Sequence, residues 1–390
     1  MPKLLYLTTQ DKFFLSHIKE RALYAKLNKF DVVVAVQQTN EDYVRKIKKM
    51  GFAFYDTGIE RQSLNPFSQL KAIFKLVKLY KKEKPDLLHN LGAKAIIYGT
   101  LAHKMAQLSS PSSIVNAPIG LGYVYASNDL KATLLRPLLN FLYRVTLNPT
   151  DSFVIFENPD DLNYFVNIGA LERTQSTCIY GAGVDTRSFC QSDLKNQICT
   201  VVMASRLIKE KGVFDFIKAA EILKKNSVPV RMQLVGEPDF GNPHSLSKQH
   251  FEDLQNNGAI ECLGYQDDVA SILKKAHICC LPSFYREGLP RFLIEGACCG
   301  LAVITTDTVG CREVVVDNNG YLIEPHNVDE LVNKITELVE NPSLTKEMGC
   351  RSRKVALKLF DKKLVCKQTY DIYEELLRQQ HHLLSKNFKI

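Results

Sequence analysis

The sequence has no apolar run approaching the about 20 residues that span a bilayer, and no Cys-x-x-Cys or Cys/His spacing of the zinc-binding kind. These absences exclude an integral membrane protein and a structural zinc site. The opening residues MPKLLYLTTQ have a strand pattern, not that of a secretory signal. Asp-x-Asp, the usual cue for a metal-bridged diphosphate, is also missing. We therefore expect a cytoplasmic protein that uses neither a metal nor a cofactor.

What the chain contains indicates two domains of similar size. Its length of 390 residues is too great for one ordinary core. All eleven cysteines follow residue 177, and the vicinal pairs Cys279/Cys280 and Cys298/Cys299 stand in apolar runs, as expected of reduced core residues. The net charge of +8 lies wholly in residues 1–175, with 23 Lys and Arg against 15 Asp and Glu. A domain with this charge either binds an anionic membrane or simply has a basic soluble surface. The sequence has no recognisable motif for reading nucleic-acid bases, so its charge does not indicate nucleic-acid binding.

Strand and helix patterns alternate throughout, which predicts doubly wound α/β domains with a ligand crevice at the carboxyl ends of the strands. The helical segment 67–84 carries Phe67, Leu70, Phe74, Val77 and Tyr80 at helical spacing. The predicted buried strands are 4–7, 32–36, 52–55, 86–89, 113–116, 153–156, 200–205, 230–236, 259–264, 277–282 and 301–307. Between 170 and 200 a short strand is mixed with glycine and polar residues, and we expect the change of domain there. GAGVD in this segment lacks the third glycine and the helix of a dinucleotide fingerprint.

Two strand-to-helix loops of the second half carry candidate site residues. Arg206 and Lys211 follow strand 200–205, where two cations and a helix terminus suit a diphosphate. In REGLPRFLIEGACCG, Glu287 and Glu295 bracket a helix that should begin at Pro290 and stop at Gly300. At 1.5 Å per residue the two carboxylates stand roughly 10 Å apart, about the length of a sugar diphosphate. From this stretch alone we would favour a different interpretation, two solvated glutamates on a surface helix.

These motifs carry a family resemblance. EGLPRFLIE, with SRLIKEKG before it and VGCREVVVDNNGYLIEP after it, closely resembles the retaining glycosyltransferases of family four, which have the GT-B fold. The resemblance covers nearly the whole chain. It implies two Rossmann-like domains facing across a cleft, with a C-terminal helix crossing back to the N-terminal domain. The implied bounds are 1–175 for an acceptor domain, 176–362 for a nucleotide-sugar domain and 363–390 for the returning helix.

The resemblance also implies roles for individual residues. Arg206 and Lys211 would hold the donor diphosphate, Glu287 would lie near the hydroxyls of the transferred sugar, and Glu295 would bind the ribose. The backbone of Gly288, Leu289 and Pro290 would lie at the sugar and phosphates, and a base-binding loop would include Gly264 and Tyr265. Catalysis is assigned to Arg206, Lys211 and Glu287, because fixed cations can stabilise a diphosphate leaving group without a metal.

The first half resembles a narrower bacterial subgroup. VNAPIGLGYVYAS followed by VIFENPDDLNYF is similar to enzymes that extend sugars on undecaprenyl diphosphate. The loop 119–127, with Gly120, Gly122 and Tyr123, should therefore face the acceptor. Many members of the family have a histidine where this chain has Ile119, so we assign no catalytic histidine; His89 is a weak substitute that a structural role fits better. The apolar segment 129–149 either packs inward, which we favour, or lies in a membrane interface.

The sequence and its resemblance thus predict a glycosyltransferase that moves a hexose, an N-acetylhexosamine or a relative, from a UDP-sugar to a lipid-linked saccharide. Retention of the anomeric configuration is implied by the resemblance only. It would act in the cytoplasm or peripherally on the inner face of the cell membrane, in surface or protein glycan assembly. A nucleotide-sugar epimerase or hydrolase of the same architecture, and a non-catalytic subunit, remain as alternatives.

Overall fold

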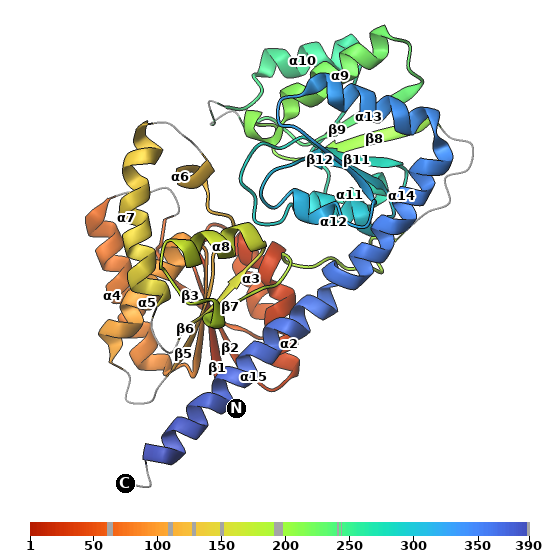
Figure 1. The fold of residues 1–390 in the computed structure, drawn as a ribbon. Coiled ribbons are helices and arrows are strands. Elements are labelled where there is room, and N and C mark those ends of the chain that lie inside the picture. The colour runs from red at the N-terminus through yellow and green to blue at the C-terminus, as the bar shows by residue number, and fades with distance from the viewer. Residues whose placement is uncertain are drawn as a thin grey trace. The chain divides into compact units, whose positions relative to one another are not determined.

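The computed structural model describes residues 1–60, 65–107, 112–126, 130–148, 152–190, 198–239, 242 and 244–387. The chain divides into two compact units, each with its own parallel sheet (Figure 1). Unit 1 comprises residues 1–182 and 363–390, and unit 2 comprises residues 183–362. The predicted fold class, two doubly wound Rossmann-like domains, is confirmed. Ser127, Asp129 and Pro149, which belong to segments discussed above, lie outside the described residues.

Unit 1 is built on a seven-stranded sheet in the order β3-β2-β1-β4-β5-β6-β7, in which every neighbouring pair is parallel. The reversal of order next to β1 is what doubly wound connectivity produces. Its strands are β1 (Lys3–Leu7), β2 (Asp31–Val36), β3 (Ala53–Asp56), β4 (Leu87–Leu91), β5 (Ser113–Ala117), β6 (Ser152–Phe156) and β7 (Ser176–Cys178). All six strands predicted for the first half are present.

Helices cover both faces of this sheet. One face packs against the first helices of the chain and the long C-terminal helix, and the other packs against α4, α5 and α7. The helical elements are α1 (Asp11–Phe13), the π-helix η1 (Phe14–Ile18), α2 (Lys19–Leu27), α3 (Glu41–Lys49), α4 (Pro66–Glu83), α5 (Ala93–Ala106), α6 (Tyr123–Ala126), α7 (Leu130–Leu147), α8 (Pro159–Asn167), the 3-10 helix η2 (Arg173–Gln175) and α15 (Lys362–Asn387).

The predicted apolar stripe of α4 is not its buried face. Phe67, Leu70 and Phe74 are exposed, whereas Val77 and Tyr80 are buried together with Ala72, Ile73, Leu76 and Leu79. At 100° per residue Phe67 and Phe74 lie about 160–180° from the buried Leu76, whereas Leu70 lies about 20° from the buried Val77 and is itself exposed. The segment has two apolar stripes, and only packing against α5 and the sheet determined which of them is buried.

The C-terminal helix α15 packs on unit 1, as the predicted fold requires, and it does so through a buried polar contact. Tyr373 is fully buried, and its hydroxyl lies 3.0 Å from that of Tyr6 and 2.5 Å from Nδ1 of His89. Burial holds the pKa of His89 well below its ordinary value, because the imidazolium would lose its hydration. His89 is therefore a neutral core residue of β4, and the structural interpretation of it is confirmed.

Unit 2 has a six-stranded parallel sheet in the order β10-β9-β8-β11-β12-β13. Strands β8, β11 and β12 are neighbours, so the loops at their carboxyl ends meet at one edge. The elements are β8 (Cys199–Ala204), η3 (Lys209–Lys211), α9 (Val213–Lys225), β9 (Val230–Val235), α10 (Lys248–Asn257), β10 (Glu261–Gly264), α11 (Val269–Leu273), β11 (Ile278–Leu281), α12 (Arg291–Cys298), β12 (Ala302–Thr306), η4 (Arg312–Val314), β13 (Gly320–Ile323), α13 (Val328–Glu340), α14 (Pro342–Val355) and η5 (Ala356–Phe360). Strand β13 was not predicted.

Candidate functional site

The first part of the site is the loop that follows β8. Arg206 comes two residues after the strand and is exposed; among the described residues its guanidinium has no hydrogen-bond or ion-pair partner. The 3-10 helix η3 then ends at Lys211, and Gly212 turns the chain into α9 with φ +75°. A Cβ on Gly212 would lie 1.9 Å from the carbonyl oxygen of Pro282. Only glycine allows this approach, which carries Lys211 to the end of β11.

An ion pair joins this loop to the one after β11. Nζ of Lys211 contacts Oε1 of Glu287, and both side chains are largely buried, with 16% and 12% of their surface exposed. The Ser283 hydroxyl lies 3.1 Å from the same Oε1 and 3.1 Å from the carbonyl oxygen of Glu210. The hydroxyl has one proton, so at any moment it donates either to the Glu287 carboxylate or to the carbonyl of Glu210 in η3. Tyr285 completes the contact, with its ring centroid 5.8 Å from the Lys211 ammonium.

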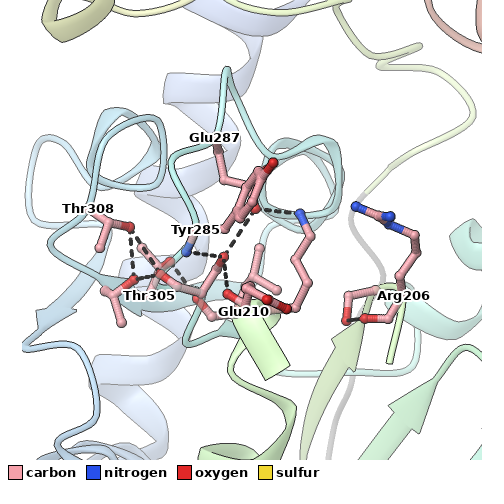
Figure 2. Close-up of polar contacts among 11 residues, drawn as sticks. Arg206, Glu210, Tyr285, Glu287, Thr305 and Thr308 are labelled. Carbon is pink, nitrogen blue, oxygen red and sulfur yellow. Dashed lines mark hydrogen bonds and ion pairs between the residues drawn. The ribbon is translucent and has the colours of Figure 1, made fainter. Parts of the chain in front are cut away.

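The backbone also ties the two loops together. The N–H groups of Phe284 and Tyr285 both donate to the carbonyl of Glu210, at 3.1 and 3.2 Å. The carboxylate of Glu210 in turn contacts Nδ1 of His244, which stands in the segment after β9. Figure 2 shows this network around Glu210, Tyr285 and Glu287, with the Arg206 guanidinium outside the dashed lines. The loops therefore hold Lys211 and Glu287 in place without any ligand.

A third loop, after β12, fixes the shape of the Glu287 segment. The hydroxyls of Thr306 and Thr308 donate to the carbonyl of Ser283. The N–H of Glu287 donates to the carbonyl of Val309 at 3.2 Å. Gly310 has φ +82°, and a Cβ there would lie 2.6 Å from the carbonyl oxygens of both Glu287 and Gly288. The third loop thus packs directly against the backbone that carries Glu287.

The second carboxylate, Glu295, is in a different environment from Glu287. It is buried inside α12, and Nε of Arg291 donates to its Oε1 at 2.7 Å. Burial raises the pKa of Glu295, and the Arg291 charge opposes this shift. The surface-glutamate interpretation is therefore wrong for Glu295. The helix bounds also differ by a residue or two from those predicted: Pro290 is the N-cap, Arg291 begins the helix, and it ends at Cys298 before Gly300.

The predicted base-binding residues belong to unit 2, and the predicted acceptor residues belong to unit 1. Gly264 ends β10 with φ +65°, and the exposed Tyr265 follows it. The N–H of Gly236, at the end of β9, donates to the carbonyl of Gly264 at 2.9 Å. Gly120 and Gly122 belong to unit 1, where both have positive φ, and Tyr123 begins α6.

Sequence reasoning missed the residues that shape the loops. Ser283, Thr306, Thr308 and Gly310 were not singled out, nor was the Glu210–His244 contact. A signal was available for the first three, since small hydroxyl residues stand at or directly after the ends of two predicted strands. That those strands are neighbours, and that their loops therefore meet, was not in the sequence pattern.

Comparison with known proteins agrees with this architecture. The family model of glycosyl transferases group 1 matches residues 186–355, and the glycosyl transferase 4-like model matches residues 3–157. The chain is 28% identical over 367 residues to the N,N'-diacetylbacillosaminyl-diphospho-undecaprenol alpha-1,3-N-acetylgalactosaminyltransferase of Campylobacter jejuni, covering 90% of this chain and 93% of that protein. It is 25% identical to the UDP-Gal:alpha-D-GlcNAc-diphosphoundecaprenol alpha-1,3-galactosyltransferase of Escherichia coli, covering 75% of this chain and 76% of that protein.

Solved structures share the fold. HepE of Anabaena, crystallised in complex with UDP, superposes with a TM-score of 0.76 at 20% identity, covering 96% of this chain and all of that one. Sucrose-phosphate synthase of Thermosynechococcus elongatus gives a TM-score of 0.80 at 17% identity, covering 97% and 100% of the two chains. The predicted GT-B fold and the predicted resemblance are both confirmed. The chain is a glycosyltransferase of the GT-B fold, whose first half matches the glycosyl transferase 4-like family and whose second half matches the glycosyl transferases group 1.

Proposed function

We propose that this glycosyltransferase moves a sugar from a UDP-sugar to a lipid-linked saccharide, carried on undecaprenyl diphosphate, in bacterial glycan assembly. One observation carries the proposal: the Lys211–Glu287 pair is held at the carboxyl edge of the unit 2 sheet, and Lys211 shares its loop with the exposed Arg206, whose guanidinium has no partner among the described residues. Two cations at a strand-to-helix turn suit a diphosphate. The UDP bound to HepE and the printed activities of the two bacterial relatives support the same donor and acceptor classes.

The donor residues divide by charge. Arg206 and Lys211 bind the diphosphate and stabilise its growing charge as the bond to the sugar breaks. Glu287 accepts hydrogen bonds from hydroxyls of the transferred sugar. Glu295, on α12, accepts hydrogen bonds from the ribose hydroxyls.

The other donor and acceptor contacts come from backbone and loops. The backbone of 288–290, ahead of the α12 N-terminus, contacts the sugar and phosphates. Gly264 and the exposed Tyr265 receive the base, with the ring offering a stacking surface. On unit 1, Gly120, Gly122 and the start of α6 face the acceptor.

The transfer keeps the anomeric configuration. The acceptor hydroxyl attacks from the side that the diphosphate leaves, the new bond to the anomeric carbon forms as the old carbon–oxygen bond breaks, and the departing phosphate oxygen takes the hydroxyl proton. No covalent glycosyl-enzyme forms in this scheme, so trapping one would contradict it. The charge is handled by fixed cations, and we expect activity to survive EDTA.

The enzyme works at the inner face of the cell membrane, where lipid-linked acceptors are built. Among its described helices, none is long and apolar enough to cross a bilayer. Reaching such an acceptor therefore calls for contact with the membrane surface.

The test is a UDP-release assay over a panel of UDP-sugars, with and without an undecaprenyl-diphosphate-linked saccharide. We expect release that depends on the acceptor. Release without any acceptor would indicate the hydrolase alternative, and no release with any UDP-sugar, in a protein that such sugars fail to stabilise, would refute the proposal. A donor at 100 times its dissociation constant should add about 2.7 kcal/mol to the free energy of unfolding, which a thermal shift detects.

A further inference from the structure

The outward face of α7 is apolar. Five of its side chains, Leu130, Leu134, Leu138, Phe141 and Val145, are exposed, Leu130 and Leu134 to 77% and 70%. At 100° per residue these five fall within an arc of about 80°, which we call the α7 stripe. The other side of α7 packs into the core of unit 1 with β6 and α8. Single exposed apolar residues are ordinary, but an aligned row of five along one helix marks an interaction surface.

A second exposed stripe runs along the first half of α4. Phe67, Leu70 and Phe74 are 83%, 54% and 49% exposed, and we call them the α4 stripe. Lys71 and Lys78 lie on the same outward face, within about 40° of Phe67. This helix therefore presents aromatic rings and ammonium groups together, as helices that lie in a membrane interface do.

The two stripes belong to one layer of helices. Helix α5 packs against both α4 and α7, and Nζ of Lys104 on α5 donates to the carbonyl of Val145 on α7 at 3.0 Å. Figure 1 shows these three helices side by side on the same face of the sheet. Together they carry ten Lys and Arg and a single acidic residue, Glu83, which is held by Lys3 and Tyr55. The layer thus combines exposed apolar stripes with a large excess of positive charge, of which Lys75 has a carboxylate outside the layer, Asp56 of β3, at 4.0 Å.

We propose that the layer of α4, α5 and α7 docks unit 1 on an anionic lipid bilayer. The two stripes enter the boundary between headgroups and acyl chains, while the lysines meet the lipid phosphates. A second copy of the chain suits the surface poorly, because a symmetric interface would bring ten cations against ten. The inference deepens the proposed function, which supplies its biological setting, but the binding itself is separable from catalysis.

The experiment is co-sedimentation of the full chain with vesicles of phosphatidylcholine alone or mixed with phosphatidylglycerol. We expect binding only to the mixed vesicles, weakened by salt. Lys71→Gln/Lys78→Gln should weaken it about 25-fold, since each cation near an anionic surface contributes roughly fivefold. Leu134→Ser/Phe141→Ser should weaken vesicle binding by at least as much, because in the wild type both apolar side chains move from water into the bilayer. Circular dichroism and melting temperature check that these exposed positions leave the fold intact.

The matched control is Lys218→Gln/Lys225→Gln, which removes two exposed charges from α9 of unit 2 and should bind as the wild type does. Failure of the wild type to bind mixed vesicles overturns the inference, as does equal loss in the control. So does a dimer in solution that Leu134→Ser/Phe141→Ser dissociates while vesicle binding persists unchanged. Vesicle binding by a chain that releases no UDP would leave this inference standing and defeat only the proposed function.

Discussion

Replacing Lys211 by methionine separates its catalytic role from its structural one. Methionine keeps most of the side-chain volume and removes the charge. Losing one fixed stabiliser of leaving-group charge costs about 100 to 1000-fold in turnover, or about 2.7–4 kcal/mol. We therefore expect UDP release in the presence of acceptor to fall by that factor.

The same substitution leaves the Glu287 carboxylate without its cation. Breaking a buried pair from one side costs about 3–5 kcal/mol. Glu287 keeps the Ser283 hydroxyl at 3.1 Å and is 12% exposed, so we expect the lower end of that range. For a unit of this size each kcal/mol lowers the melting temperature by about 2–4 °C, which predicts a drop of about 6–12 °C. Assays must therefore be run well below the melting temperature of the variant.

A double-mutant cycle with Glu287→Gln decides what Lys211 touches. If its ammonium contacts the diphosphate, Lys211→Met still lowers turnover in the Glu287→Gln background. If it acts only by holding Glu287, that second loss disappears and the proposed role is wrong. The control is Lys209→Met, an exposed lysine of the same 3-10 helix, which should change neither turnover nor stability. Wild-type turnover in folded Lys211→Met would remove this residue from the mechanism altogether.

Three further predictions follow from single residues. Arg206→Ala should leave stability within about 0.5 kcal/mol, because the side chain is exposed and unpartnered among the described residues, yet weaken UDP binding in calorimetry by about 10 to 100-fold. Gly310→Ala should destabilise unit 2 by about 1–3 kcal/mol, measured by denaturant unfolding, and lower turnover by displacing the Glu287 backbone. His89 is protonated in the unfolded chain below about pH 6.5 but stays neutral in the folded chain. The free energy of unfolding of unit 1 should therefore fall as the pH is lowered, by up to about 1.4 kcal/mol for each pH unit. His89→Gln should remove this dependence.

Each of these has an outcome that would contradict it. Unchanged UDP affinity in Arg206→Ala would show that the exposed guanidinium does not meet the nucleotide. The control for Gly310→Ala is Gly258→Ala. Gly258 has a similar φ of +67°, but a Cβ there would meet only the flexible Lys224 ammonium, at 3.4 Å. Equal effects of the two substitutions would mean that backbone strain, not contact with the Glu287 loop, causes the loss of stability and turnover. Identical pH dependence with and without His89 would mean that the histidine is not buried as a neutral residue.

Much of the fold could be read from local pattern. Eleven of the thirteen strands were predicted within a few residues, because buried parallel strands are short apolar runs in any context. Of the other two, β7 was expected only as a short strand somewhere between 170 and 200, and β13 was not predicted; they are three and four residues long and partly exposed, so their apolar signal is weak. The helix faces were harder, since α4 has two apolar stripes and period alone does not say which one meets the sheet.

The sequence by itself determined the alternation of strands and helices, the two-domain division and the residue types at the ends of β8 and β11. Only the tertiary structure decided that Lys211 and Glu287, 76 positions apart, form one pair, and that Ser283, Thr306 and Gly310 hold its backbone. The reason is physical: burial and helical period act between near neighbours in the chain, whereas these contacts depend on the strand order that places β8, β11 and β12 side by side. Tertiary structure also decided which stripes of α4 and α7 are exposed, because a helix face stays in solvent only when other faces of that helix pack against the core.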